Sequence, residues 1–202
     1  MRKCGIPLVL LLVLLLAGCH TIEYADVSTL EVGSRGDVIQ VVVDPFSQED
    51  GDEEGLRAMI RESVQEYNDA AGSERIVLGD LKFQEGQVRM MVNYENCTDY
   101  AAFNNVTLFQ GTVEEAVVEL YSFDDTFQDK AGETITGEEL QETAGQESVL
   151  ILEEPVQVKV PGKIQYVSSN VKILSDHLAE VQSGDEGEDT VVTEKEAYIV
   201  YK

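Results

Sequence analysis

An acidic loop in the first third of the chain has the ligand spacing of a calcium-binding loop. Asp50, Asp52 and Glu54 stand at its first, third and fifth positions and Gly55 at the sixth, as in an EF-hand. The twelfth position requires a bidentate Glu but holds Arg61, whose charge opposes a cation. Acidic residues ahead of a helix are also favoured by the helix dipole without any metal. We therefore expect a solvated helix N-terminus, with Asp50, Asp52 and Glu54 as the candidate ligands for a cation.

The side chains that catalyse reactions are few and poorly spaced. The chain has no Gly-x-Ser-x-Gly, no His-Glu-x-x-His and no phosphate-binding glycine loop. His177 follows Asp176 in an expected strand, where neighbouring side chains point to opposite faces and cannot act together as base and orienting acid. Asp124 and Asp125 stay open as a glycosidase pair, although 39 acidic residues bring some carboxylates together in any fold. We expect no enzymatic activity and no cofactor.

Two short signals have a structural explanation beside the functional one. Cys97 is flanked by Glu95 and Asp99, which disfavour a thiolate, so we expect a buried or half-buried apolar side chain rather than a reactive thiol. The segment 35–37 has the sequence Arg-Gly-Asp, which integrins recognise, at an expected hairpin tip. Gly and Asp are also typical turn residues, so we interpret this segment as a turn.

Aromatic and amide side chains in the middle of the chain are the candidate partner-binding residues. The chain has no Trp, which disfavours a carbohydrate- or choline-binding platform. Tyr and Asn, however, make the adaptable contacts that recognition surfaces use. Most aromatic residues here are expected in the core, with an exposed subset lining a binding face that includes Tyr94, Tyr100, Asn104 and Asn105.

Apolar periodicity and turn residues define the elements that must position these side chains. Apolar residues at helical spacing predict a helix from the acidic loop to Ala71, with Gly72 as its stop. Thr98 is expected to cap a short helical turn through Phe103. β-rich runs separated by Gly-containing turns predict two hairpins, formed by Thr29–Val32 with Val38–Asp44 and by Arg75–Phe83 with Gln87–Tyr94.

The second half of the chain is expected to be richer in strands. Thr112 and Glu115 match a capping box, which predicts a helix of at most three turns, and Gly137–Gln141 is a candidate helical turn. We predict an α+β fold with a largely antiparallel sheet, two main helices and a β-rich C-terminal part. Residues 29–202 are expected to form a single domain, with a possible sub-boundary near residue 128. The other expected strands are Val106–Phe109, Ser148–Leu152, Val156–Val160, Ile164–Val167, Val171–Leu174 and Ala197–Tyr201.

Charge and composition exclude several functional classes. The 202 residues include 14 Lys and Arg against 39 Asp and Glu, a formal net charge of −25. Such a surface repels phosphate backbones and anionic headgroups, which argues against nucleic-acid binding and against membrane adsorption by charge alone. Hydrophobic residues make up 43% of the chain, which is too many for a disordered acidic tail.

The N-terminus carries the most specific signal in the sequence. Basic residues at 2 and 3 precede a short apolar run, as in a cleaved secretory signal, here residues 1–18. Leu16-Ala17-Gly18-Cys19 resembles the lipobox of bacterial lipoproteins. The resemblance implies that Cys19 takes a diacylglyceryl group and becomes the first mature residue. Residues 19–28 would then be a short lipidated tether, and the domain would lie outside the cytoplasm, anchored to the cell membrane.

The rest of the chain is similar to a group of small surface lipoproteins of Gram-positive anaerobes. The similarity rests on segments 37–46, 100–109, 161–168 and 197–202. It implies a surface location and assigns no activity. The favoured hypothesis is a membrane-anchored, non-enzymatic binding module with an envelope protein as partner. The alternative is a lipoprotein that binds a small ligand or a divalent cation.

Overall fold

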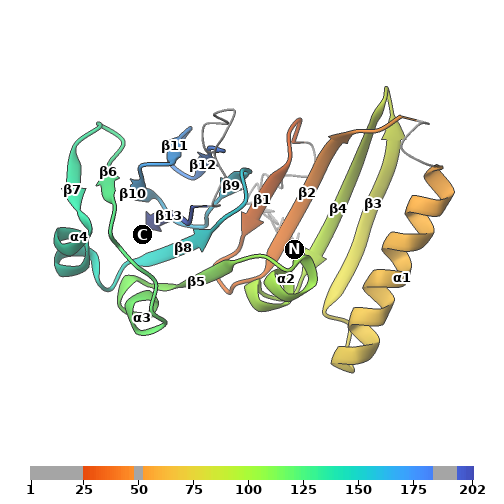
Figure 1. The fold of residues 1–202 in the computed structure, drawn as a ribbon, viewed down its shortest axis with the longest axis horizontal. Helices are drawn as coiled ribbons and strands as arrows, with labels where there is room; N and C mark the ends of the chain where they lie inside the picture. The colour runs from red at the N-terminus through yellow and green to blue at the C-terminus, as the bar shows by residue number, and fades with distance from the viewer. Residues whose placement is uncertain (1–24, 48–51, 184–194) are drawn as a thin grey trace, which may run out of the picture.

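The computed structural model describes residues 25–47, 52–183 and 195–202, and it shows an α+β fold of two mostly antiparallel sheets. Figure 1 shows the sheets side by side, with α1 at one end of the molecule and α4 at the other. The four helices in the described residues are α1 (Glu53–Ala71), α2 (Cys97–Asn104), α3 (Val113–Val118) and α4 (Gly137–Ala144).

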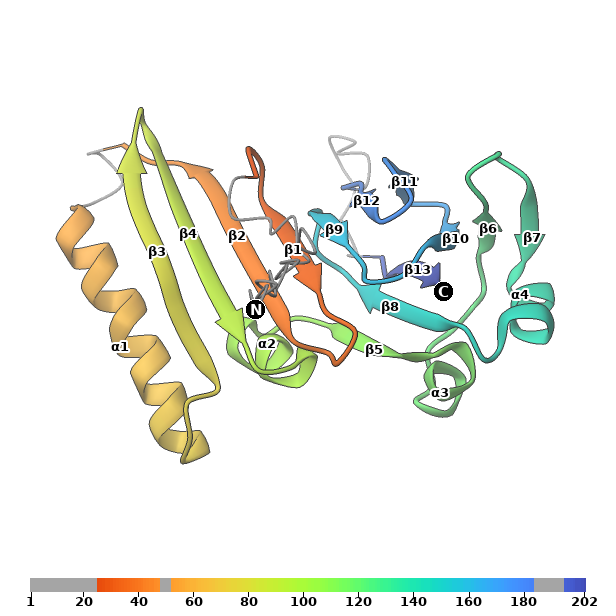
Figure 2. The same ribbon diagram turned by 180° about the vertical axis from the view of Figure 1, so that it is seen from behind.

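The first sheet has seven strands in the order β11-β12-β9-β1-β2-β4-β3. Adjacent strands in this sheet are antiparallel, except that β1 and β9 are parallel. These two strands lie together at the centre of Figure 2. Both predicted hairpins are confirmed, β1 with β2 and β3 with β4. The strands are β1 (Thr29–Val32), β2 (Val38–Pro45), β3 (Ile76–Gln84), β4 (Gln87–Tyr94), β9 (Gln157–Lys159), β11 (Val171–Ile173) and β12 (Leu178–Val181).

The second sheet has six strands in the order β5-β8-β13-β10-β6-β7, all antiparallel. Its central strands, β8 and β13, are almost wholly buried. The strands are β5 (Leu108–Thr112), β6 (Thr126–Gln128), β7 (Thr134–Thr136), β8 (Ser148–Leu152), β10 (Ile164–Ser168) and β13 (Ala197–Tyr201).

Side-chain alternation divides each sheet into two faces, and two hydrophobic cores follow from this. One core joins the inner face of the seven-stranded sheet, including Leu30 and Val158, to Leu152 and Ile199 of the six-stranded sheet. The other lies on the opposite side of the six-stranded sheet, against α3 and α4. The first core joins residues on both sides of position 128.

Local capping explains where the helices begin and end. Asp52 accepts a hydrogen bond from the Gly55 N–H, and Gly72 ends α1 in the left-handed conformation, as the sequence predicts. The capping box of Thr112 and Glu115 is also confirmed. The prediction for α2 was wrong in its cap: Asn96, not Thr98, accepts from the backbone of the first turn.

Three strands and the helix lengths differ from the predictions. Strands β6, β7 and β12 were not predicted: each has three or four residues, and none contains the Val-rich run that marked the equally short β9 and β11. The helices contain 19, 8, 6 and 8 residues, so α1 is the long helix and α3 is shorter than its capping box suggested.

Candidate functional site: the groove between α1 and β3

Strand β3 forms one edge of the seven-stranded sheet, and α1 runs alongside it (Figure 1). An edge strand exposes backbone N–H and C=O groups that can pair with another chain. Here the side chain of Asn68 takes that place at one end. Its Oδ1 accepts from the N–H groups of Arg75 and Ile76 at 2.8 and 2.9 Å, and its Nδ2 donates to the Ile76 carbonyl at 2.8 Å.

The edge is also covered further along β3. The guanidinium of Arg57 donates to the Leu81 carbonyl at 2.9 Å and lies 5.3 Å from the centroid of the Phe83 ring. Between Leu78 and Leu81 the β3–β4 register shifts, so the strand bends there. Backbone N–H groups two residues apart in a strand point to the same edge, so the N–H of Leu78 points to the edge where Ile76 contacts Asn68. Leu78 lies between Ile76, which Asn68 contacts, and Leu81, which Arg57 contacts.

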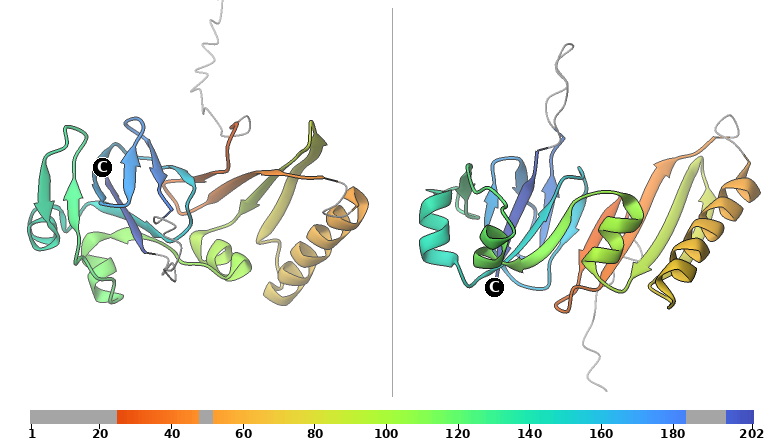
Figure 3. Two further views of the ribbon diagram at one scale, coloured as in Figure 1. Left: turned by 45° about the horizontal axis from the view of Figure 1, so that its top comes forward. Right: turned by 60° about the horizontal axis from the view of Figure 1, so that its bottom comes forward.

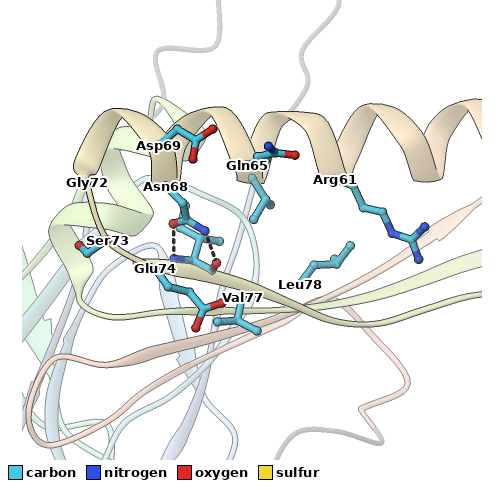
Figure 4. Close-up of a pocket in the computed structure, with 11 residues that line it drawn as sticks. Arg61, Gln65, Asn68, Asp69, Gly72, Ser73, Glu74, Val77 and Leu78 are labelled. Atoms are coloured by element: carbon cyan, nitrogen blue, oxygen red, sulfur yellow. Dashed lines mark hydrogen bonds between the residues drawn. The ribbon is translucent and has the colours of Figure 1, made fainter.

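A groove of about 670 Å³ lies between α1 and β3 and runs from Arg61 and Leu78 past the Asn68 contact to residues 72–74. Figure 4 shows Arg61 and Gln65 of α1 on one side and Leu78 and Val77 of β3 on the other. Val77 is 44% exposed, and its register opposite Asn93 places its side chain on the face of the sheet away from α1. The groove itself combines a sheet edge, the apolar side chain of Leu78 and charged groups. Its lining is Arg61, Val64, Gln65, Asn68, Asp69, Gly72, Ser73, Glu74, Ile76, Val77 and Leu78.

The groove is lined by charged, polar and apolar side chains. No His or Cys lines it, and its one hydroxyl, on Ser73, has no imidazole or thiol among the lining residues. Arg61, Asp69 and Glu74 offer charged contacts to a ligand. Sequence reasoning missed this site because its backbone edge exists only once β3 lies at the end of the sheet.

The predicted cation ligands do not come together in the described residues. Asp52 is the N-cap of α1 and Glu54 is an exposed residue of its first turn, as expected for a solvated helix N-terminus. Asp50 lies outside the described residues. In ranges 25–47, 52–183 and 195–202, no group of three His, Cys, Asp or Glu side chains is placed to hold a metal ion.

The expected exposed face of tyrosines is wrong, because Tyr94 and Tyr100 are 3% and 1% exposed. Both lie in the core with their rings edge to face at 5.0 Å. Tyr94 alternates with Val92 on the buried side of β4, and Tyr100 is buried in α2 together with Cys97 and Asp99. Asn104 is half-buried, and Asn105 is exposed and ends α2 in the left-handed conformation.

These tyrosines instead form a buried hydrogen-bond network. The Tyr94 hydroxyl donates to Gln40 Oε1 at 2.9 Å and accepts from Asn104 Nδ2 at 3.2 Å. The Tyr100 hydroxyl donates to Glu154 Oε2 at 2.7 Å and accepts from Gln40 Nε2 at 3.3 Å. Burial raises the pKa of Tyr94 to about 12, and burial together with the Glu154 carboxylate raises the pKa of Tyr100. The network is structural, and it joins β2, β4 and α2 to the β8–β9 loop.

A second contact that the sequence did not predict ties α1 to α2. The Tyr67 hydroxyl donates to Asp99 Oδ1 at 3.0 Å, and burial together with this carboxylate raises the pKa of Tyr67. Asp99 is 9% exposed, and its Oδ2 is buried without a hydrogen-bond partner in the described residues. Its position in the first turn of α2 favours the negative charge.

Asp125 does not have the properties of a glycosidase acid. Lys195 Nζ contacts both Asp125 Oδ2 and Ser169 Oγ at 2.9 Å, and Ser169 donates to the same carboxylate. Burial alone would raise the pKa of Asp125, but the hydrogen bonds from Lys195, Thr126 and Ser169 outweigh it and lower the pKa. A general acid needs a raised pKa. Asp124 instead accepts from the Ser122 hydroxyl.

Ser169 also has Ser-x-x-Lys spacing with Lys172, a signal that sequence reasoning missed. Ser169 lies in the turn after β10 and Lys172 lies in β11, so the two are not one turn apart on a helix. Lys195 Nζ donates to both Asp125 and Ser169, so it is not placed as a base for that hydroxyl.

The short motifs have structural roles, as expected. Cys97 is buried, its thiol contacts the Gly36 carbonyl at 3.5 Å, and burial raises its pKa to about 12. Gly36 has a positive φ of 86° in the turn between β1 and β2, and Gln110 donates to the Gly33 carbonyl of the same turn. His177 is an exposed residue before β12 whose Nδ1 lies 2.8 Å from the Gly162 carbonyl.

Cys19 and residues 1–18 lie outside the described residues. Within the described ranges, none of the helices combines the length and the apolar character that crossing a membrane requires. No protein-family model, curated protein or solved structure matches this chain.

Proposed function

We propose that this chain is a lipid-anchored extracytoplasmic protein that binds an envelope protein without catalysing a reaction. The anchor is Cys19, which follows the signal-like segment 1–18 and ends the lipobox-like sequence Leu-Ala-Gly-Cys. The described residues support a binding role through the groove between α1 and β3, which places charged and apolar side chains beside a sheet edge.

The α1–β3 groove is the binding site in this proposal, and the open sheet edge at Leu78 is the observation that carries it. An extended segment of a partner can add to such an edge through backbone hydrogen bonds while its side chains enter the groove. The hydrogen bonds of Asn68 with Ile76 have the geometry of a neighbouring strand, which supports this mode of binding. Leu78 supplies apolar contact area.

The charge of the chain favours a basic segment. Glu62, Glu66 and Asp69 follow one another on the exposed surface of α1 beside the groove. The whole chain has a formal net charge of −25, which speeds the approach of a positively charged partner and repels acidic partners. We therefore expect an extended basic segment as the bound element.

A small-molecule ligand is the second candidate. The groove volume of about 670 Å³ lies within the range of roughly 300–1,000 Å³ that such ligands occupy. A small ligand would be held mainly by Arg61, Asp69 and Glu74, and the Leu78 edge would remain unpaired. The two candidates differ in whether a protein occupies the groove.

Cross-linking in intact cells, followed by isolation of the anchored protein, tests the proposal. Gln65→Trp places a large ring in the groove, and Glu62→Trp places the same ring on α1 outside it. We expect the wild type and Glu62→Trp to recover one stoichiometric partner. Gln65→Trp should lower the amount of recovered partner at least fivefold. Equal recovery with both variants would exclude the groove as the binding site.

The lipid anchor has a separate test. The Cys19→Ala protein should remain unprocessed or be released from the membrane. Unchanged processing and membrane retention of this variant would contradict lipidation.

A further inference from the structure

The seven-stranded sheet has an outer face that none of its described helices covers. The register places Thr29, Glu31, Ile39, Val41 and Met91 on this face. None of these side chains belongs to the two clusters above, whereas their neighbours in the same strands line the inner face. Thr29 and Val41 are buried, and Glu31, Ile39 and Met91 are half-buried. Figure 3 (left) shows α1, α2 and α3 together on the other side of this sheet. We call this surface the outer face.

The N-terminal end of the described chain lies on the outer face. Arg89 alternates with Met91 and so projects from this face, and its guanidinium donates to the Ala25 carbonyl. Figure 3 (left) shows the red N-terminal end of the ribbon on the side away from the helices. Only five residues lie between Cys19 and Ala25, a reach of at most about 20 Å. A lipid on Cys19 therefore holds the outer face close to the bilayer.

The charges of the molecule are distributed unevenly between the two sides. The outer face carries Lys82, Arg89, Lys159 and Lys172 together with Glu31, Asp80 and Glu180, so basic and acidic groups nearly balance. The helices on the opposite side are strongly acidic. Their basic residues are Arg57 and Arg61, and their acidic residues are Glu53, Glu54, Glu62, Glu66, Asp69, Asp99, Glu114, Glu115, Glu138, Glu139 and Glu142.

We propose that the outer face lies against the headgroups of the bilayer that holds Cys19, and that α1 and its groove face away from it. This inference rests on the proposed lipid anchor. Anionic headgroups repel the acidic helices and attract exposed Lys and Arg, each by about 1 kcal/mol at the surface. Half-buried Ile39, Val43 and Met91 add apolar contacts at the same surface. The short tether and the charge asymmetry therefore select one orientation, which leaves the groove accessible.

Fluorescence quenching by brominated lipids tests this orientation. The chain lacks Trp, so a single introduced Trp is the only indole reporter. Gln87→Trp places it on the outer face and Gln65→Trp on α1; both positions are exposed and neither change alters the charge. Each lipidated variant is purified from membranes and reconstituted in phosphatidylcholine–phosphatidylglycerol vesicles with and without brominated chains.

We expect the Gln87→Trp fluorescence to be quenched at least twofold more strongly than that of Gln65→Trp. The double variant Lys82→Glu with Lys172→Glu should reduce this difference, because it reverses charge on the outer face. Equal quenching at both positions, or stronger quenching on α1, would overturn the orientation while leaving the anchor intact. Failure of the processed protein to associate with vesicles would instead overturn the lipid anchor, and this inference with it.

Discussion

The side chain of Asn68 forms both hydrogen bonds with the backbone of Ile76 that a neighbouring strand would form. One carboxamide therefore substitutes for a strand at the end of β3 and fixes the C-terminal half of α1 against the sheet edge. Natural proteins commonly cover edge strands in this manner, because open edges promote aggregation. The groove runs past this contact, from Arg61 and Leu78 to residues 72–74.

Loss of the Asn68 carboxamide should destabilise the fold. Asn68→Ala leaves the Ile76 N–H and C=O without these partners, and we expect a loss of about 1–3 kcal/mol in the free energy of unfolding. Urea denaturation of the domain measures it. The control is Gln65→Ala on the same helix, whose exposed side chain should contribute less than about 0.5 kcal/mol. Equal effects of the two changes would show that Asn68 does not hold the edge.

Stability should fall at alkaline pH because buried acids ionise only in the unfolded chain. Cys97 and Tyr94 have ordinary pKa values of 9.0 and 10.0, and burial raises both to about 12. Between those values the folded chain binds more protons than the unfolded chain, so stability decreases as pH rises, by up to about 1.4 kcal/mol per pH unit for each group.

Urea unfolding between pH 8 and 11 measures this dependence. Tyr94→Phe should make the decline above pH 10 shallower, because one group no longer titrates. A slope unchanged by Tyr94→Phe would show that this hydroxyl is not protected from ionisation. Cys97 should also resist alkylation at pH 8 in the folded chain and react once urea unfolds it.

Replacing Leu120 by Gly should stabilise the protein. Leu120 follows α3 with a φ of 70°, a strained backbone conformation for a residue other than Gly. Its side chain is 89% exposed, so packing does not offset the strain. Gly adopts this conformation readily, and we expect the free energy of unfolding to rise by about 0.5–1 kcal/mol. Thermal and urea unfolding measure the change. Val118→Gly, at the last residue of α3, should lower stability. A destabilised Leu120→Gly variant would contradict the strain.

Gly137 should not tolerate a side chain. A Cβ at this position would lie 1.7 Å from the carbonyl oxygen of Phe123, so α4 would have to move away from that segment. We expect Gly137→Ala to lower the free energy of unfolding by about 1–3 kcal/mol. Glu142→Ala on the exposed side of α4 should change it by less than about 0.5 kcal/mol. Equal stability of the two variants would show that the contact relaxes without cost.

Sequence patterns predicted those elements whose signals are local. The caps of α1, the capping box at Thr112 and both N-terminal hairpins depend on residues a few positions apart. The division into two sheets was not predicted, because it depends on β9 pairing with β1 across 128 positions, and on β13 entering the centre of the other sheet. Nothing in the short runs themselves encodes these partners.

The candidate site was less predictable than the fold. Tyr94 and Tyr100 looked like recognition residues because composition does not reveal which face of a strand or helix is buried. The groove has no motif, since its distinctive feature is backbone at a sheet edge. The role of Asn68 could not be predicted either, because its partner Ile76 comes beside it only in the folded chain.

Site-specific photo-cross-linking from the groove tests the central proposal most directly. A photoreactive phenylalanine analogue at Ser73, an exposed residue that lines the groove, is compared in intact cells with the same analogue at Glu142 on α4. We predict one discrete protein adduct from position 73 that is absent from position 142 and is suppressed by Gln65→Trp. Identical adducts from both positions, or no protein adduct from position 73, would contradict the binding of an envelope protein in this groove.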